Sequence, residues 1–228
     1  NIIDAVIKVK ISNDTIDCTF EKIRKLTKGR SVDLIIGGPP CQAYSLLGRH
    51  RKEMEDDPRT LLYLQYGKFL EEFKPKGFVF ENVPGLLSAK KGEHFKNLQV
   101  YFKELGYNVH FQMLNAADYG VLQNRKRIIL VGWINEQDHG FPNISTCRSE
   151  AIVNNILSDL PILKAGEVKN VAPYIGQINT YLEESGIRSN EDMFVTQNIS
   201  RPVNENDASI YNYAIRTWSN KRVRVKYT

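Results

Sequence analysis

Strand-like and helix-like stretches alternate through the first part of the chain, and this alternation limits the folds that the chain can adopt. An apolar run at 32–36 ends at two glycines, a pattern typical of a buried parallel strand. Helical periodicity follows at 59–73, and a second strand-like run lies at 77–80. The pattern predicts an α/β domain with a mostly parallel sheet. In such a sheet the chemistry lies in loops that follow the carboxyl ends of the strands.

The remaining elements continue this series. We expect a helix at 95–105, ended by Gly106, and two further strands at 107–114 and 127–133. Near the carboxyl terminus, basic and apolar residues alternate over 221–227, which predicts a half-buried strand with a basic outer face.

Prolines and polar residues become more frequent after about residue 140, and we place a domain boundary there. The 228 residues divide into a first domain at 1–143 and a second, more irregular segment at 144–228. A chain of this length can bury one core and a smaller second one.

Composition excludes several classes of protein. The net charge of +5 weakly favours an anionic partner such as nucleic acid. Three cysteines without a CxxC pair and four histidines without metal-ligand spacing argue against a disulfide framework and a metal site, and a reducing cytosol fits best. No apolar run approaches membrane-spanning length and no signal peptide is visible, so no membrane partner is expected.

Cys41 stands in the sequence GGPPCQ, directly after the first predicted strand. Pro39 and Pro40 fix φ and lack N–H donors, so this turn cannot continue a strand ladder or a helix. Gly37 and Gly38 permit close backbone approach. Such a turn would hold a thiol at the end of a sheet, where a nearby cation favours the reactive thiolate. A buried structural cysteine is the alternative.

Two further groups of polar residues follow predicted strands or precede them. Glu81 ends the second strand, where partial desolvation would suit a carboxylate to proton donation, although a helix cap or a loop acid is an equal alternative. Arg125 and Arg127 are spaced to lie on one face of the last strand, and their guanidinium groups can hold a carboxylate, a phosphate or a base carbonyl. A solvated basic edge is the alternative reading of this pair.

A long polar loop at 42–58 separates Cys41 from the first predicted helix. It carries a basic stretch, Arg49 to Lys52, and then four acidic residues. A loop of this length inside a compact domain is usually functional or mobile, and a basic stretch beside a nucleophile could guide a polyanion. A solvated charged loop is the alternative.

These residues together resemble the DNA cytosine-5 methyltransferase family. GGPPCQAYS is similar to the family's nucleophile motif, FENVPG to its ENV motif and QNRKR to its QxRxR motif. The order and the spacing also match, with 40 residues from Cys41 to Glu81 and 44 more to Arg125. The resemblance is close over 32–133 and fainter over the segment ISRPVNENDASIYNYAIRTW. It implies a Rossmann-like domain, incomplete at its amino terminus, followed by the start of a smaller recognition domain.

The resemblance implies a reaction and a role for each matching residue. The enzyme would transfer a methyl group from S-adenosylmethionine, without a metal, to C5 of a cytosine flipped out of double-stranded DNA. Cys41 would attack C6, and Glu81 would hydrogen-bond or protonate N3. Arg125 would bind O2, and Arg127 would help to hold the site. The implied setting is a bacterial restriction–modification system in the cytoplasm, near the nucleoid.

The same resemblance assigns the surrounding contacts. The base pocket would be lined by Pro39, Pro40 and Asn82. DNA would be contacted by Gln42, Ser45 and Arg59. The cofactor would be contacted by Pro40 and Leu62.

Parts of the family pattern are missing. The glycine-rich strand–loop that binds the methionine end of the cofactor has no counterpart, the adenine-contacting acid could be Asp4 or Asp17, and the two final motifs are absent. We expect a fragment, or half of a split enzyme completed by a second polypeptide, and expect the chain alone to be inactive or weak. The competing hypothesis is a non-catalytic DNA-binding or partner-binding module; methylation of RNA is a third possibility.

Overall fold

The computed structural model describes residues 6–40 and 62–225 and divides into two compact units, Asn1–Ser149 and Glu150–Thr228. The domain boundary predicted from the sequence lies slightly earlier, after residue 143. None of the helices in the described ranges is both long enough and apolar enough to cross a membrane.

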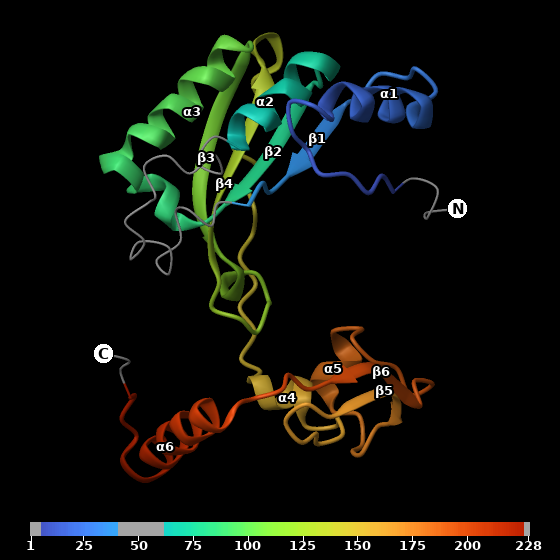
Figure 1. Ribbon diagram of the computed structural model, residues 1–228, viewed down its shortest axis with the longest axis vertical. Coiled ribbons are helices and arrows are strands. Elements are labelled where there is room, and N and C mark those ends of the chain that lie inside the picture. Colours follow the sequence, from blue (N-terminus) through green and yellow to red (C-terminus); the bar gives the residue numbers. More distant parts are fainter. Residues whose placement is uncertain (1–5, 41–61, 226–228) are drawn as a thin grey trace. The chain divides into compact units, whose positions relative to one another are not determined.

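Unit 1 contains a four-stranded sheet in the order β1-β2-β4-β3 (Figure 1). Its strands are β1 (Leu34–Gly37), β2 (Gly77–Asn82), β3 (Tyr107–Asn115) and β4 (Lys126–Ile134). Strands β1 and β2 are parallel, whereas β4 runs antiparallel to both of its neighbours, β2 and β3. The α/β class is confirmed, and every strand expected in this unit is present.

The expectation of a mostly parallel sheet is wrong for two of the three strand pairs. Only residues 116–125 connect β3 to β4, and they include the short 3₁₀ helix η6 (Ala116–Asp118). A parallel pair needs a crossover of about a dozen residues or more, usually a helix. The short connection therefore folds β4 back beside β3 as an antiparallel strand.

Three helices accompany the sheet: α1 (Ile16–Thr27), α2 (Leu62–Phe73) and α3 (Glu93–Glu104). The left-handed conformation of Gly106, with φ of 90°, follows the end of α3 as expected, because glycine adopts this region without strain. Two 3₁₀ helices, η4 (Pro84–Leu87) and η5 (Ala89–Gly92), lead into α3, and η7 (Asn135–Gln137) follows β4.

Helices α2 and α3 cover one face of the sheet with an aromatic core. Rings of Tyr66 on α2 and Phe102 on α3 both pack against Phe78 and Phe80 of β2, mostly edge to face. The two helices approach closely at Gly67, where an added Cβ would lie 2.1 Å from the Tyr101 ring. The buried cluster comprises Tyr63, Tyr66, Leu70, Phe78, Phe80, Leu86, Phe95, Leu98, Phe102, Tyr107, Ile128 and Leu130.

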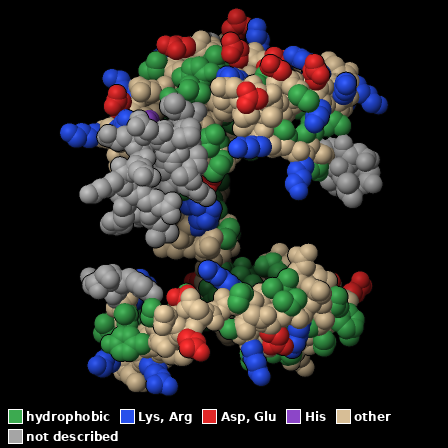
Figure 2. All heavy atoms as spheres, viewed as in Figure 1, with side chains coloured by type: hydrophobic (Ala, Val, Ile, Leu, Met, Phe, Trp, Pro, Cys, Tyr) green, Lys and Arg blue, Asp and Glu red, His purple; other side chains and the backbone are tan. Residues whose placement is uncertain are grey.

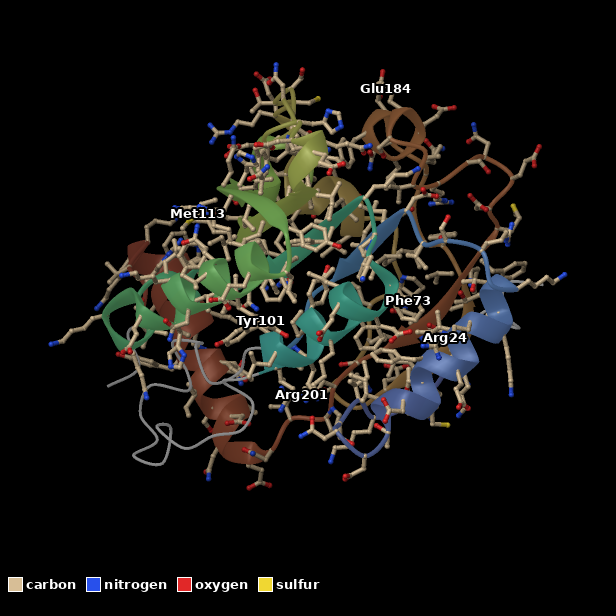
Figure 3. The ribbon with its side chains drawn as sticks, turned by 90° about the horizontal axis from the view of Figure 1, so that it is seen from above. Arg24, Phe73, Tyr101, Met113, Glu184 and Arg201 are labelled. Atoms are coloured by element: carbon tan, nitrogen blue, oxygen red, sulfur yellow. The ribbon has the colours of Figure 1, made fainter. Side chains whose placement is uncertain are left out.

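Helix α1 packs on a second side of α2. The Phe20 ring lies 5.0 Å from Phe69 and 5.4 Å from Phe73, edge to face, and Arg24 is paired with Glu72. Figure 3 shows Phe73 of α2 and Arg24 of α1 close together, with Tyr101 on the α3 side of α2. The apolar residues of α2 therefore pack against two neighbours: Tyr66 packs against the sheet, and Phe69 and Phe73 pack against α1.

Unit 2 is built on a two-stranded antiparallel sheet of β5 (Val168–Pro173) and β6 (Phe194–Ile199). Helices α4 (Val153–Leu157) and α5 (Thr180–Glu184) accompany it. Its interior holds an ion pair between Asp159, which is 2% exposed, and Arg188, whose guanidinium lies 3.6 Å from the centroid of the Tyr174 ring. A buried carboxylate needs such a partner, so this pair fixes the packing of the unit.

The last helix, α6 (Glu205–Lys221), begins at Asn204, whose side chain accepts a hydrogen bond from the Asp207 amide at 2.8 Å. Hydrophobic side chains gather on its surface (Figure 2), including the exposed Tyr213 and Ile215. The strand expected at 221–227 is wrong within the described residues: Lys221 ends α6, and 222–225 form no strand. Arg222 instead caps the helix in the left-handed conformation, and no strand of the described part of the chain pairs with 222–225.

Candidate active site

The carboxyl end of β1 lies close to both α2 and β2, and two glycines allow this approach. A Cβ atom on Gly37 would lie 2.7 Å from Cε2 of Tyr66, and one on Gly38 would lie 2.8 Å from Oε2 of Glu81. Both distances are shorter than van der Waals contact, so a side chain at either position would displace its neighbour. The glycines therefore bring the turn that precedes Cys41 against the Glu81 carboxylate.

Glu81 lies near the end of β2 and is paired with Arg127 of β4. Nε of Arg127 lies 2.6 Å from Oε1 of Glu81, and the two side chains are 22% and 40% exposed, respectively. The register places Glu81 opposite Ile129, so Arg127 is its diagonal neighbour on the same face of the sheet. This charge-assisted contact orients the carboxylate, while Oε2 lies on the Gly38 side.

The direction of β4 brings these two side chains together. Because β4 is antiparallel to β2, the first residues of β4 lie beside the last residues of β2. A parallel β4 would place Arg127 near Gly77, at the opposite end of the sheet. The antiparallel direction of β4, which was not predicted from the sequence, thus brings Arg127 to Glu81.

Asn82 joins the ENV segment to the proline turn. Its side chain is 2% exposed, and Nδ2 donates a long hydrogen bond of 3.5 Å to the Pro39 carbonyl. Its Oδ1 accepts from the Val83 amide at 2.8 Å. Pro39 is half-buried and Pro40 is exposed. Three of the residues expected in the base pocket therefore lie at one end of β1 and β2.

Arg125 lies just outside β4, not on the same strand face as Arg127. The 3₁₀ helix η6 turns the chain away opposite Arg125, so the ladder between β3 and β4 begins at the pair Asn115–Lys126. The Arg125 carbonyl still accepts a hydrogen bond from the Ala116 amide at 3.0 Å. Its side chain is exposed, and no ion pair joins it to another residue of the described ranges. Among the described residues, the Arg125 guanidinium is therefore exposed.

Four of the expected site residues, Cys41, Gln42, Ser45 and Arg59, lie outside the described residues. Leu62, expected at the cofactor, is the first residue of α2 and is half-buried. The structure therefore brings together the expected Pro39, Glu81, Asn82 and Arg127. In the sequence, Cys41 follows Pro40 directly.

Tyr66 is a neighbour of the site that none of the sequence motifs selects. Its ring lies over Gly37, and its hydroxyl lies 3.1 Å from the Ile35 carbonyl and 3.0 Å from the Val79 carbonyl. Helical periodicity locates a tyrosine on the buried face, but it carries no signal for what the hydroxyl contacts.

The described residues fit only part of an S-adenosylmethionine site. Pro40 and Leu62 present apolar surface at the ends of β1 and α2, which suits a methyl or methylene group. Within 6–40 and 62–225 no group of three or more His, Cys, Asp or Glu side chains is arranged to hold a metal ion.

Comparison with known proteins supports the reading of these motifs. The family model for C-5 cytosine-specific DNA methylases matches residues 6–228. Type II methyltransferase M.Bpa9945I of Bacillus paralicheniformis is 37% identical over 222 residues, covering 88% of this chain and 49% of the relative. Type II methyltransferase M1.HphI of Haemophilus parahaemolyticus is 38% identical over 138 residues, covering 60% of this chain and 37% of the relative. The chain thus spans half or less of the length of these relatives.

Part of a solved structure is similar in fold to this chain. An E. coli prophage-encoded protein, described as a DNA modification methyltransferase, is 25% identical with a TM-score of 0.55. The match covers 70% of this chain and 45% of that one. The arrangement of strands and helices in this chain is therefore similar to part of a methyltransferase.

Proposed function

The chain belongs to the C-5 cytosine-specific DNA methylase family, and from this premise we propose that it forms the catalytic part of an enzyme that methylates C5 of cytosine in DNA. The methyl donor is S-adenosylmethionine, and the system is a bacterial restriction–modification system of type II. The names and sequences of the relatives support this setting.

The observation that carries the proposal is the Glu81–Arg127 pair and its position against Gly38. A carboxylate fixed at 2.6 Å by a guanidinium lies beside a backbone segment that leads, through two prolines, to Cys41. A nucleophile and a group able to hydrogen-bond or protonate a base ring are thus held by neighbouring parallel strands. A module that only binds DNA has no need of this combination, so the pair favours the enzyme over the non-catalytic alternative.

Each residue suits one step on a cytosine that has left the base stack. The Cys41 thiolate forms a bond to C6 while Glu81 hydrogen-bonds or protonates N3, which relieves the negative charge that develops on the ring. Arg125 binds O2, and Arg127 holds the Glu81 carboxylate. C5 thereby becomes the nucleophile, and S-adenosylmethionine supplies an electrophilic methyl group when bound. Loss of the C5 proton and cleavage of the bond from sulfur to C6 complete the turnover.

The surrounding residues bind and orient the substrate. Pro39, Pro40 and Asn82 line the base pocket, and Pro40 and Leu62 contact the cofactor. DNA is contacted by Gln42, Ser45 and Arg59. Unit 2 is the beginning of the region that reads the DNA sequence, with a boundary between the functions at about 143 to 149.

The test is covalent capture of DNA that contains 5-fluorocytosine. Fluorine at C5 cannot leave as a proton does, so the bond from Cys41 to C6 should persist when the protein from the complete reading frame reacts with cofactor present. A denaturation-resistant complex that Cys41→Ser abolishes supports the mechanism. Intact protein that binds both DNA and cofactor but forms no such complex would refute it.

The RNA alternative is tested by the same assay with an RNA of identical sequence. We expect capture of the duplex DNA alone. Capture of RNA at the same rate or faster would overturn the assignment of DNA as the substrate.

A further inference from the structure

The Tyr66 hydroxyl bridges the ends of the two parallel strands that carry the proposed catalytic residues. It lies 3.1 Å from the Ile35 carbonyl of β1 and 3.0 Å from the Val79 carbonyl of β2. A hydroxyl has one proton, so it donates to one carbonyl at a time or shares the proton between both. Either arrangement ties β1 to β2 two residues before Gly37 and Glu81.

The ring that carries this hydroxyl is itself firmly held. It is 8% exposed, and the centroids of Phe80, Phe102 and Phe78 lie 5.2, 5.9 and 6.0 Å from its own. Burial, and to a smaller extent the neighbouring Tyr107, raise the pKa of Tyr66 well above its usual range, so the hydroxyl stays protonated as a donor. The same ring occupies the space that a side chain at position 37 would need.

The residue that follows this contact touches the proposed catalytic carboxylate. The Gly38 backbone passes so close to Oε2 of Glu81 that a Cβ would lie 2.8 Å away. A continuous series of contacts therefore leads from Tyr66 to the carboxylate. The ring and hydroxyl of Tyr66 contact the end of β1, and Gly38, which follows β1, contacts Glu81. A shift of the end of β1 would move the Gly38 backbone relative to the Glu81 carboxylate.

We propose that Tyr66 is a positioning residue that fixes the end of β1 against Glu81, and so aligns the segment that leads to Cys41 with the group that acts on N3. The inference rests on the proposed function of Cys41 and Glu81. Tyr66 acts through the backbone of β1. A misplacement of about 1 Å can cost about 100-fold in rate when two groups act on one substrate.

Tyr66→Phe removes the bridge and keeps the ring, and Tyr107→Phe is the matched control. The Tyr107 hydroxyl is also buried and donates to a backbone carbonyl, that of Pro75, at 3.0 Å. Pro75 precedes the amino end of β2, so this bond lies at the end of the strand away from Glu81. The two variants remove buried tyrosine hydroxyls at opposite ends of β2, of which Tyr66 contacts two carbonyls and Tyr107 contacts one.

The experiment measures the rate of covalent capture of 5-fluorocytosine DNA by the complete protein, with DNA dissociation constants and melting temperatures for each variant. We expect Tyr66→Phe to slow capture about ten-fold at saturating DNA and cofactor, with DNA affinity within two-fold of wild type, on the order expected for a sub-ångström shift. Tyr107→Phe should capture at the wild-type rate, while both variants lose similar amounts of thermal stability.

The possible outcomes separate this inference from the proposed function. If the wild type captures the DNA and Tyr66→Phe captures it at the same rate, the positioning role is overturned and the proposed function stands. Equal slowing in both variants would also overturn it, since general loss of stability would then explain the effect. Absence of capture by the wild type would refute the proposed function and, with it, the role of Tyr66.

Discussion

The two faces of the sheet in unit 1 are made by alternate residues of the same strands, but their environments differ. On the face beneath α2 and α3, Phe78 and Phe80 are completely buried. On the opposite face, some alternate residues of β1 and β2 remain accessible, with Ile36 72% and the Glu81 side chain 40% exposed. One set of strands thus provides a rigid aromatic core and, one residue away, the polar groups of the proposed site. Substitutions on the two faces should therefore separate into effects on stability and effects on activity.

The largest difference between the effect on activity and the effect on stability is expected for Glu81→Gln. The amide keeps the shape of the carboxylate but cannot supply a proton or the charge that Arg127 holds. We expect the rate of methyl transfer by the complete protein to fall about 10²- to 10⁴-fold, as for loss of an acid–base group. Single-turnover methylation of DNA measures this rate.

Stability should hardly change in the same variant, because the Glu81–Arg127 pair is partly solvated and such pairs contribute about 0–1 kcal/mol. Urea denaturation is the control. A fall in rate matched by a large loss of stability would show that Glu81 is structural.

Phe78→Ala should have the opposite profile. This ring is completely buried among Tyr66, Phe102 and Tyr107, and its removal leaves a cavity. We expect a loss of about 3–5 kcal/mol in the free energy of unfolding, measured by urea denaturation. Val79→Ala, at the next position and on the other face, is the matched control and should cost clearly less. Equal losses would contradict the distinction between the faces.

The adjacent glycines offer a smaller and sharper test. Gly37→Ala places a methyl group against the anchored Tyr66 ring and should cost about 1–3 kcal/mol of stability. Gly38→Ala meets the end of the Glu81 side chain, which can move, so stability should fall by less than about 1 kcal/mol. Methyl transfer should nevertheless slow about ten-fold in Gly38→Ala, because the carboxylate is displaced.

Measuring both quantities for both variants checks this prediction. It is wrong if the Gly38 variant loses more stability than the Gly37 variant, or if it methylates at the wild-type rate.

The smallest effect is expected for Ile36→Ser, on the exposed face of β1. A side chain that is 72% exposed contributes little burial, so the free energy of unfolding of this chain should change by no more than about 0.5 kcal/mol. Thermal or urea denaturation measures the change. A loss near that of a core substitution would show that Ile36 is covered in solution.

The separate elements of unit 1 follow from the sequence more readily than their assembly does. Apolar runs and periodicity locate β1, β2 and α3, and the glycine after α3 takes the conformation that its position predicts. Periodicity carries no information about strand direction. The sheet is expected to be mostly parallel, but β4 is antiparallel to both of its neighbours. The shortness of the connection at 116–125 is the signal that would have revealed it.

In the proposed site, too, the sequence identifies residues but does not show how they are assembled. Sequence motifs select Glu81 and Arg127, but only the register of β2 and β4 explains why these two side chains meet. The hydroxyl of Tyr66 bridges carbonyls from two strands, and no local pattern encodes such a contact. The alternation at 221–227 misleads for a related reason, because a strand needs a partner and α6 already extends through Lys221.

The place of β4 in the sheet has a consequence for the order of synthesis. A ribosome completes β2 before it makes residues 126–134, so one side of β2 is at first an open edge with unpaired amide and carbonyl groups. Open edges invite pairing with other chains, and a charged residue on such an edge discourages it. Arg127 is made with β4, so its ion pair with Glu81 can form only when this edge closes. The polar pair of the proposed site is therefore among the last contacts of β2 to form.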